Sequence, residues 1–144
     1  MIGILIALLS GILMSVQGVL NTQVTKMTSV WVTNIWVQMT ALFMCLCIWG
    51  IADRTHIMTL TKVEPRYLLL GGVIGTFITL TVIKSMGSLG PAKAVMLIVV
   101  AQIVSSYCIE LFGLFGMERV GITMNKVIGL VLAIVGIIIF EWNS

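Results

Sequence analysis

The stretch that decides the fold is MIGILIALLSGILMSVQGVLNTQV, residues 1–24. A helix that crosses the hydrocarbon core of a membrane, roughly 30 Å thick, needs about 20 predominantly apolar residues. This stretch is long enough and contains no charged side chain. It has no basic n-region and no small-residue cleavage site, and its second half carries Gln17, Asn21 and Gln23. We therefore expect a membrane span here and not a signal peptide.

The composition of the whole chain also indicates an apolar environment. Of the 144 residues, 60% are hydrophobic and only 9% are charged, and the mean hydropathy is +1.19. Soluble domains carry about 25% charged residues, so these figures exclude a soluble enzyme and a disordered chain. The net charge of +3 comes from Lys and Arg that are spread along the chain, which excludes a nucleic-acid-binding face. The sequence predicts an all-α integral membrane protein in the lipid bilayer.

Five apolar segments with short connections account for the chain. We predict spans at about 1–24, 30–52, 67–86, 91–115 and 126–142. Aromatic residues that favour a membrane interface stand near the ends of these spans; they are Trp31, Trp49 and Trp142. No segment remains for a soluble domain, so residues 1–144 are predicted to form a single transmembrane domain.

Polar side chains inside two of these spans recur at helical spacing. In the first span the polar residues Ser10, Gln17 and Asn21 stand at i, i+7 and i+11, with the apolar Met14 at i+4. In the fourth span they are Gln102, Ser106 and Glu110, at i, i+4 and i+8. Each set therefore lies on one face of its helix. Amides and carboxylates are costly in hydrocarbon, so both faces should point into the protein or into a wet cavity.

Two interpretations of these faces stay open. In the first, a cavity binds a substrate through Gln17, Asn21, Gln102 and Ser106, and Glu110 carries a proton or pairs with a cation. In the second, the amides form hydrogen bonds between helices. Glu110 then lies at the water interface, because it stands only one or two turns from the end of its helix.

Small residues form stripes on the first, third and fifth spans. They are Gly11, Ser15, Gly18 and Thr22 on the first span, Gly71 and Gly75 on the third, and Gly129 and Ala133 on the fifth. Stripes of small residues let helix backbones approach closely in lipid. We expect these glycines to pack helices together.

The basic residues give only a weak preference for one orientation. With five spans, one side of the membrane holds Arg54, Lys62, Arg66, Arg119 and Lys126, and the other holds Lys26, Lys84 and Lys93. This bias favours a cytoplasmic N-terminus, but it is small enough for one chain to insert both ways. Two opposed copies would form a ten-helix antiparallel homodimer with the inverted-repeat symmetry of alternating-access transporters. A homologous five-helix partner would serve equally well.

Lys84 and Lys93 flank the turn between the third and fourth spans. Their long stems can reach the lipid headgroups, which is the ordinary behaviour of lysine near a helix end. If they face a cavity instead, the preferred substrate is anionic.

The chain carries no catalytic or cofactor signature. No His, Cys or carboxylate pair has catalytic spacing. The only histidine, His56, stands apart from the cysteines. We expect no enzyme activity, no metal and no cofactor.

Several motifs, taken in order, resemble one family. Residues 11–21 read GILMSVQGVLN, residues 71–75 read GGVIG, and residues 110–116 read ELFGLFG. Over nearly its whole length the chain resembles the YdcZ-type inner-membrane exporters, domain-of-unknown-function family 606, in the drug/metabolite transporter superfamily. The Gln-x-x-x-Asn of the first span and the segment from Gln102 to the Gly-Leu-Phe-Gly motif are the specific parts. Glu110 is a departure, because the family often has Asp there.

The resemblance implies a multi-pass protein of the bacterial cytoplasmic (inner) membrane, built of five-helix chains that act in pairs or as tandem fusions. It supplies no substrate. We predict a secondary transporter that exports a small organic molecule by alternating access, with proton coupling taken from the wider superfamily. The alternative is a non-transporting membrane subunit that supports a partner enzyme or channel and uses the same polar residues to hold helices together.

Overall fold

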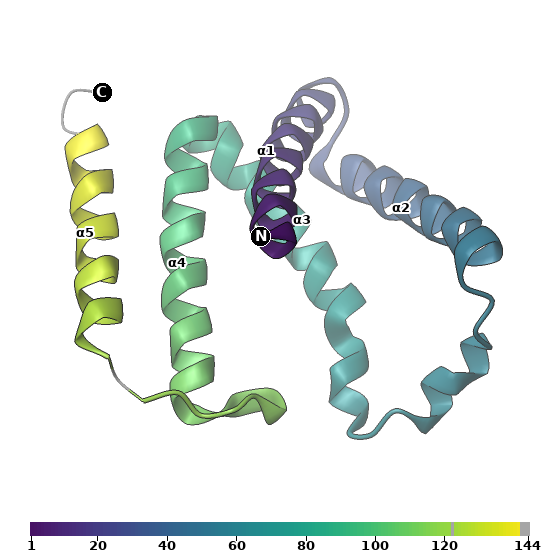
Figure 1. The fold of residues 1–144 in the computed structure, drawn as a ribbon. Coiled ribbons are helices and arrows are strands. Elements are labelled where there is room, and N and C mark those ends of the chain that lie inside the picture. Colours follow the sequence, from purple (N-terminus) through teal and green to yellow (C-terminus); the bar gives the residue numbers. More distant parts are fainter. Residues whose placement is uncertain (122, 142–144) are drawn as a thin grey trace. The chain divides into compact units, whose positions relative to one another are not determined.

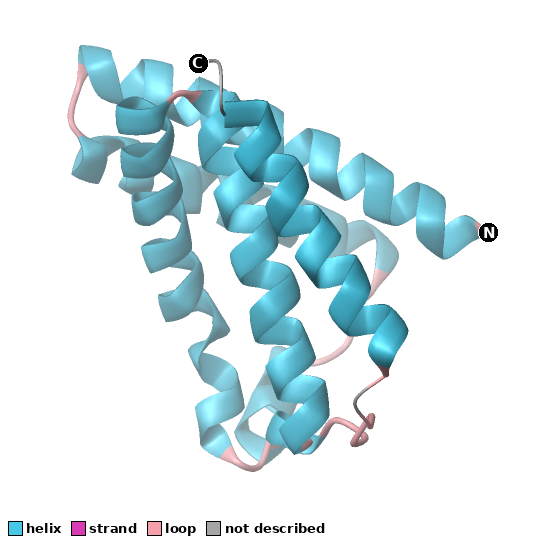
Figure 2. Ribbon diagram, turned by 90° about the vertical axis from the view of Figure 1, so that its left-hand side faces the viewer, coloured by secondary structure: helices cyan, strands magenta, loops and turns pink. Residues whose placement is uncertain are grey.

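The described chain is entirely helical apart from its connections. The computed structural model describes residues 1–121 and 123–141, and over these ranges it contains five α-helices and three short 3₁₀ helices (Figures 1 and 2). The α-helices are α1 (Ile2–Met27), α2 (Val30–Ala52), α3 (Gly71–Leu89), α4 (Pro91–Phe112) and α5 (Met124–Glu141). The 3₁₀ helices are η1 (Ile57–Lys62), η2 (Arg66–Leu70) and η3 (Leu114–Gly116). No residue of these ranges lies in a strand, which confirms the all-α prediction.

Four helical segments of the described chain are long and apolar enough to cross a membrane. They are Ile2–Met27, Val30–Ala52, Arg66–Leu89 and Pro91–Phe112. The apolar part of α5, Met124–Phe140, is shorter. With a rise of 1.5 Å per residue α5 is about 27 Å long, slightly less than the hydrocarbon core. A fifth crossing therefore stays a prediction, and Trp142, expected at its interface, lies outside the described residues.

The ends of two helices are determined by glycine. α4 ends at Phe112 and not at residue 115, because Gly113 adopts a left-handed conformation with a φ of 62°. Such a glycine commonly ends a helix. α3 runs on to Leu89, beyond the predicted end at residue 86, and is followed by Gly90 with a φ of 81°. The ends of α1 and α5 also differ from the predicted spans, since hydropathy marks the hydrocarbon and not the end of a helix.

The chain divides into two compact units. One is Met1–Ser88, which contains α1, α2 and α3, and the other is Leu89–Ser144, which contains α4 and α5. A single transmembrane domain over residues 1–144 stays a prediction.

Hydroxyl groups join the end of α1 to the start of α2 in the first unit. Ser29 caps α2 by accepting a hydrogen bond from Val32 N at 3.2 Å, as a serine before a helix commonly does. Thr33, only 1% exposed, accepts a hydrogen bond from Thr25 Oγ1 at 2.9 Å. The Thr33 hydroxyl also donates to Ser29 O at 3.0 Å. The turn between the two helices is therefore built from its own polar side chains.

Two amides join α2 to α3. Asn34, only 2% exposed, donates from Nδ2 to the carbonyl oxygen of Thr76 at 3.0 Å. Gln38, one turn further along α2, donates from Nε2 to Thr76 Oγ1 at 3.3 Å. Hydrogen bonds of this kind hold helices together where no water competes for the polar groups.

Gly18 allows α1 to approach α3. A Cβ atom at this position would lie 2.5 Å from Met86 Cε and 3.3 Å from Val82 Cγ1. Met86 is buried. The absence of a side chain at Gly18 thus creates the space that the methionine fills, and this is how small residues act between membrane helices.

The segment after α2 is held by local hydrogen bonds. Trp49 Nε1 donates to the carbonyl oxygen of Thr55 at 2.9 Å. Thr55 in turn donates its hydroxyl and its backbone N–H to Asp53 Oδ1. The side-chain hydrogen bond, and then the backbone one, hold the pKa of Asp53 below its ordinary value, because both stabilise the charged carboxylate.

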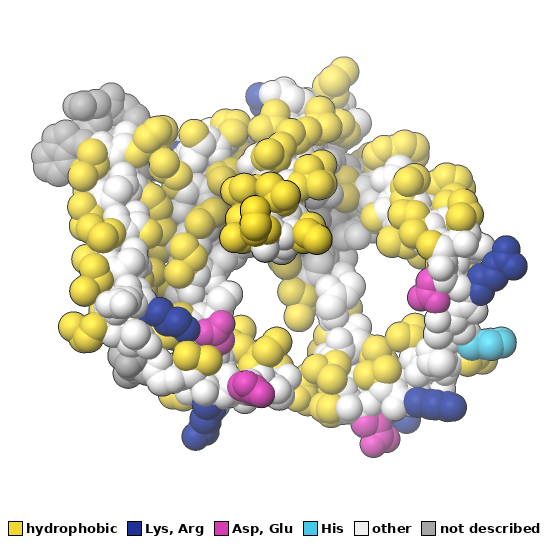
Figure 3. All heavy atoms as spheres, viewed as in Figure 1, with side chains coloured by type: hydrophobic (Ala, Val, Ile, Leu, Met, Phe, Trp, Pro, Cys, Tyr) yellow, Lys and Arg dark blue, Asp and Glu magenta, His cyan; other side chains and the backbone are white. Residues whose placement is uncertain are grey.

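Hydrophobic side chains form most of the surface. On the face seen in Figure 3 they cover the helices, whereas charged side chains lie at helix ends and connections. The hydrophobic residues that are buried in the described chain are Ile83, Met86 and Ala94. So extensive an apolar surface requires lipid or another protein chain as its surroundings.

The amide of Asn34 provides a test of this packing. We expect Asn34→Ala to lower the free energy of unfolding by about 0.5–1.5 kcal/mol, the range for an interhelical hydrogen bond in a membrane. The measurement is denaturant unfolding of the full chain in lipid bicelles. The control is Asn21→Ala, which removes an amide that has no hydrogen-bond partner among the described residues. Equal losses in the two variants would contradict the assignment.

Candidate functional site

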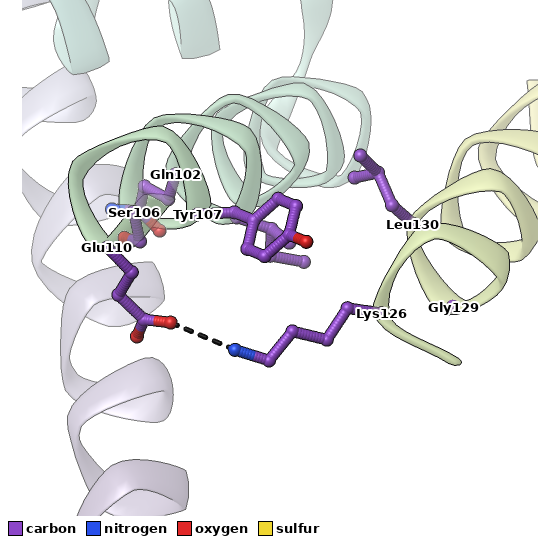
Figure 4. A pocket seen from close by; sticks show the side chains of 8 residues that line it. Gln102, Ser106, Tyr107, Glu110, Lys126, Gly129 and Leu130 are labelled. Atoms are coloured by element: carbon purple, nitrogen blue, oxygen red, sulfur yellow. Dashed lines mark hydrogen bonds and ion pairs between the residues drawn. The ribbon is translucent and has the colours of Figure 1, made fainter. Parts of the chain in front are cut away.

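A groove runs between α4 and α5 within the second unit. It has a volume of about 450 Å³ and is lined by Gln102, Ile103, Ser106, Tyr107, Glu110, Lys126, Gly129 and Leu130 (Figure 4). We call it the α4–α5 groove. It contains all three polar residues predicted on the fourth span, because the spacing i, i+4, i+8 gives them one face of α4. The volume is in the range of small-molecule sites.

An ion pair stands at the end of this groove. Lys126 Nζ lies 3.0 Å from Glu110 Oε2, with the two side chains 43% and 45% exposed. Glu110 lies in the last turn of α4 and Lys126 in the first turn of α5. The carboxylate is therefore near the connection between the helices, about 12 Å along the helix axis from Gln102 at mid-helix.

Tyr107 forms the wall beside the ion pair. Lys126 Nζ lies 5.2 Å from the centroid of the Tyr107 ring, within the distance of a cation–π contact. Figure 4 shows the ring between the two helices, pointing from α4 toward α5. The Tyr107 hydroxyl is buried and has no hydrogen-bond partner among the described residues, which is a costly state for a polar group.

The connection between α4 and α5 folds back on the end of α4. Val120 N donates to Glu110 O at 3.0 Å, and Arg119 Nε donates to Phe112 O at 3.2 Å. A Cβ on Gly113 would lie 2.7 Å from Arg119 Cγ. This glycine thus serves both the left-handed turn and the close return of the chain, and the return fixes the backbone that carries Glu110.

A smaller pocket lies between α1 and α3 in the first unit. It has a volume of about 60 Å³ and is lined by Met14, Gln17, Gly18, Asn21, Ile78, Thr79 and Val82. We call it the α1–α3 pocket. It brings together the predicted substrate-binding residues of the first span, Gln17 and Asn21. Gln102 and Ser106, the other predicted pair, line the α4–α5 groove of the second unit.

The comparison with protein families shows to which family the chain belongs. The family "Putative inner membrane exporter, YdcZ" matches residues 2–139. The chain belongs to this family. No significant match was found among curated proteins or among solved structures. The match covers almost the whole chain and confirms the resemblance that the motifs indicated.

Membership in the YdcZ family places the chain in the cytoplasmic membrane as a multi-pass protein. It also makes the chain a member of an exporter family and not of an enzyme family. Within residues 1–121 and 123–141 no group of three or more His, Cys, Asp or Glu residues could hold a metal ion. The site of this YdcZ-family protein is therefore built from amides, hydroxyls, an aromatic ring and one ion pair.

The predicted polar residues differ from the other amides of the chain in their hydrogen bonding. Four of them have no side-chain hydrogen-bond partner in the described chain: Gln17, Asn21, Gln102 and Ser106. Asn34 and Gln38 of α2, in contrast, bond to Thr76 of α3. The amides that hold helices together are thus different from the amides that line the two pockets.

Among the predicted glycines, only Gly18 meets another helix within the described chain. The others would have nothing within 4 Å of an added Cβ: Gly11, Gly71, Gly75 and Gly129. Their packing role stays a prediction that requires surroundings outside this chain.

The two lysines near the turn between α3 and α4 have different surroundings. Lys84 is exposed. Lys93 lines a groove of about 240 Å³ together with Met96 of α4 and with Ile137 and Phe140 of α5. That groove is otherwise apolar, so it offers little to orient a polar solute.

Sequence reasoning missed Tyr107 and the role of Lys126. The charge count placed Lys126 only among the basic residues on one side of the membrane, and its separation of 16 residues from Glu110 gives no helical register. The α4–α5 turn alone brings the two together. Asn34 and Gln38 were also missed, although two amides at i and i+4 in an apolar span are a readable signal.

The charges of the ion pair oppose the helix dipoles. A helix C-terminus favours cations and an N-terminus favours anions, yet Glu110 stands in the last turn of α4 and Lys126 in the first turn of α5. We expect the exchange Glu110→Lys with Lys126→Glu to raise the free energy of unfolding by about 0.5–1 kcal/mol, because it keeps the pair and removes the conflict.

The exchange is compared with each single substitution in bicelle unfolding experiments, which gives the coupling between the two positions. Glu110→Lys and Lys126→Glu should each lower stability, since each places two like charges together. An exchange variant that is less stable than the natural protein would show that the dipole conflict does not govern this pair.

Proposed function

We propose that the chain is one half of a secondary transporter that exports a small organic molecule by alternating access. The observation that carries the proposal is a set of polar side chains in the α1–α3 pocket and the α4–α5 groove, Gln17, Asn21, Gln102 and Ser106, which have no hydrogen-bond partner among the described residues. Polar groups at membrane depth are retained where they face a cavity or a pathway. Helix packing is achieved by other residues, so these groups are free to bind a solute.

In this proposal the amides orient the solute and the ion pair couples its movement. Gln17 and Asn21 bind the solute from the α1–α3 pocket, and Gln102 and Ser106 bind it from the α4–α5 groove. Glu110 exchanges between Lys126, a proton and a cation during the cycle. The Glu110 carboxylate can be released from the Lys126 ammonium at a low cost in free energy, because an exposed ion pair is weak. The site can therefore hold the carboxylate with or without its lysine partner.

The second half is supplied by another chain. We propose an antiparallel homodimer of ten helices, or a pair with a homologous five-helix chain. Inverted symmetry of two halves is the arrangement with which many transporters alternate between the two sides. The apolar surface of the chain and the glycines that face open space in it, such as Gly11 and Gly75, provide the faces for such a partner.

Transport in proteoliposomes tests the role of Glu110. Liposomes loaded with a pH-sensitive dye receive a panel of small amines, carboxylates, sugars and nucleosides. We expect at least one class to drive proton movement with the natural protein, and Glu110→Gln to abolish it. Glu118→Gln is the matched control, because this acid lies in the α4–α5 connection and does not line the groove. Solute-driven proton movement that is unchanged in Glu110→Gln would eliminate the coupling role.

The amides have a separate test in the same assay. Gln102→Leu should reduce the initial rate roughly fivefold to tenfold, the effect of losing one hydrogen bond of about 1 kcal/mol to the solute. Gln38→Leu removes an amide that is used between α2 and α3, so it should lower stability and leave the rate nearly unchanged. Transport that is insensitive to Gln102→Leu would contradict the role of this amide, and transport that is absent for every solute would favour a non-transporting membrane subunit.

Labelling from the two sides of the membrane tests the antiparallel dimer. In a variant without the native cysteines, new cysteines replace the exposed residues Ser29 and Thr61. We expect a membrane-impermeant maleimide to label each site partly from outside and completely after lysis, because the weak charge bias lets the chain insert both ways. Labelling of each site from one side only would rule out dual insertion and indicate a separate partner chain.

A further inference from the structure

The α4–α5 groove already holds a cation, and the chain itself supplies it. The ammonium group of Lys126 lies between the Glu110 carboxylate, at 3.0 Å, and the ring of Tyr107, at 5.2 Å from the centroid (Figure 4). Carboxylates and aromatic faces both bind ammonium ions in proteins. Both of these groups come from α4, whereas the cation comes from α5 on a flexible stem.

We propose that the α4–α5 groove binds a small organic cation and that Lys126 is a tethered competitor for the same position. The substrate ammonium takes the place of the lysine ammonium beside Glu110 and Tyr107. The displaced side chain moves to the polar boundary of the membrane. This inference rests on the proposed function, since it names the substrate class of the same groove.

The charges of the groove favour a cation over an anion. Of the residues that line it, Glu110 and Lys126 are the charged ones. When the Lys126 ammonium leaves the groove, the negative charge of Glu110 remains, and one positive charge on the ligand neutralises it. An anion bound to Lys126 would instead displace Glu110 and lie beside the electron-rich face of Tyr107, which repels it.

Lys126 is placed so that it can leave. Its side chain is 43% exposed and stands in the first turn of α5. A lysine stem is long enough to carry the ammonium from a helix end to the headgroup region. The pair with Glu110 also opposes both helix dipoles. The Lys126 ammonium is therefore neither deeply buried in the groove nor held there by the helix dipoles.

The remaining polar groups indicate that the cation carries a second polar group. The Tyr107 hydroxyl is buried without a partner, and Gln102 and Ser106 line the same groove without side-chain hydrogen bonds in the described chain. Gln102 lies two turns of α4 from the ion pair. A ligand that spans this length satisfies the amide at one end and the carboxylate at the other.

Direct binding measurements test the inference without requiring transport. The full chain is placed in nanodiscs of neutral lipid and titrated by calorimetry with benzyltrimethylammonium and, separately, with benzoate, with empty nanodiscs as the blank. We expect the natural protein to prefer the cation. Lys126→Gln should bind it about fivefold more tightly because the competitor is gone, whereas Lys126→Arg should not gain affinity.

Two further variants identify the groups that hold the cation. Glu110→Gln and Tyr107→Leu should each weaken binding of benzyltrimethylammonium about tenfold, whereas Tyr107→Phe keeps the ring and should bind like the natural protein. Helix content and monodispersity are checked for every variant, and Lys126→Met replaces Lys126→Gln if the latter aggregates.

Three results would overturn the inference. The first is that neither the natural protein nor the lysine variants bind the cation. The second is that cation binding is unchanged or weaker when Lys126 is neutralised, and the third is that the protein prefers benzoate and loses this binding with Lys126. Each of these can occur while the proteoliposome assay still reports transport, so the substrate class fails separately from the transporter. Cation binding without any transport would support the groove and contradict the proposed function.

Discussion

The structure depends on one physical constraint, which is that hydrocarbon offers no hydrogen bonds and little solvation of charge. Helices meet this constraint for the backbone, and the described chain contains no strand. Side chains meet it in two ways. Thr33, Asn34 and Gln38 bond to neighbouring turns and helices. Gln17 and Gln102 line pockets and have no hydrogen-bond partner in the part of the chain that the structure describes. This division separates groups that stabilise the fold from groups available to a solute.

The same constraint explains why the Glu110 carboxylate of α4 is paired with the Lys126 ammonium of α5. A carboxylate near the end of a membrane helix is tolerable when an ammonium faces it. The chain closes the pair with a turn in which Gly113 adopts a left-handed conformation and Val120 bonds back to Glu110. The pair nevertheless opposes the helix dipoles, so its polarity is not explained by stability. The exchange of charge that we propose for Glu110 gives this polarity a role in transport.

The small buried core follows from the surroundings. A soluble protein of this length would enclose many apolar side chains, because their removal from water drives folding. In a membrane the lipid covers these side chains, and helices associate through small residues and polar contacts instead. Gly18 against Met86 is one such contact inside the chain. Gly11, Gly71, Gly75 and Gly129 have nothing from the described residues within 4 Å of an added Cβ, so these positions are open to the second chain that we propose.

The sequence by itself determined the membrane class, the helical fold and the polar faces of α1 and α4. These follow from composition and from a helical period that any helix must obey. It also indicated the family, through motifs in α1, at the start of α3 and at the end of α4. Only the tertiary structure decided that Lys126 pairs with Glu110 over Tyr107, that Asn34 and not Gln17 joins two helices, and that α4 ends at Phe112, before Gly113. Such contacts depend on the path of the turn and on how helices rotate against one another, and neither is contained in the periodicity of a single helix.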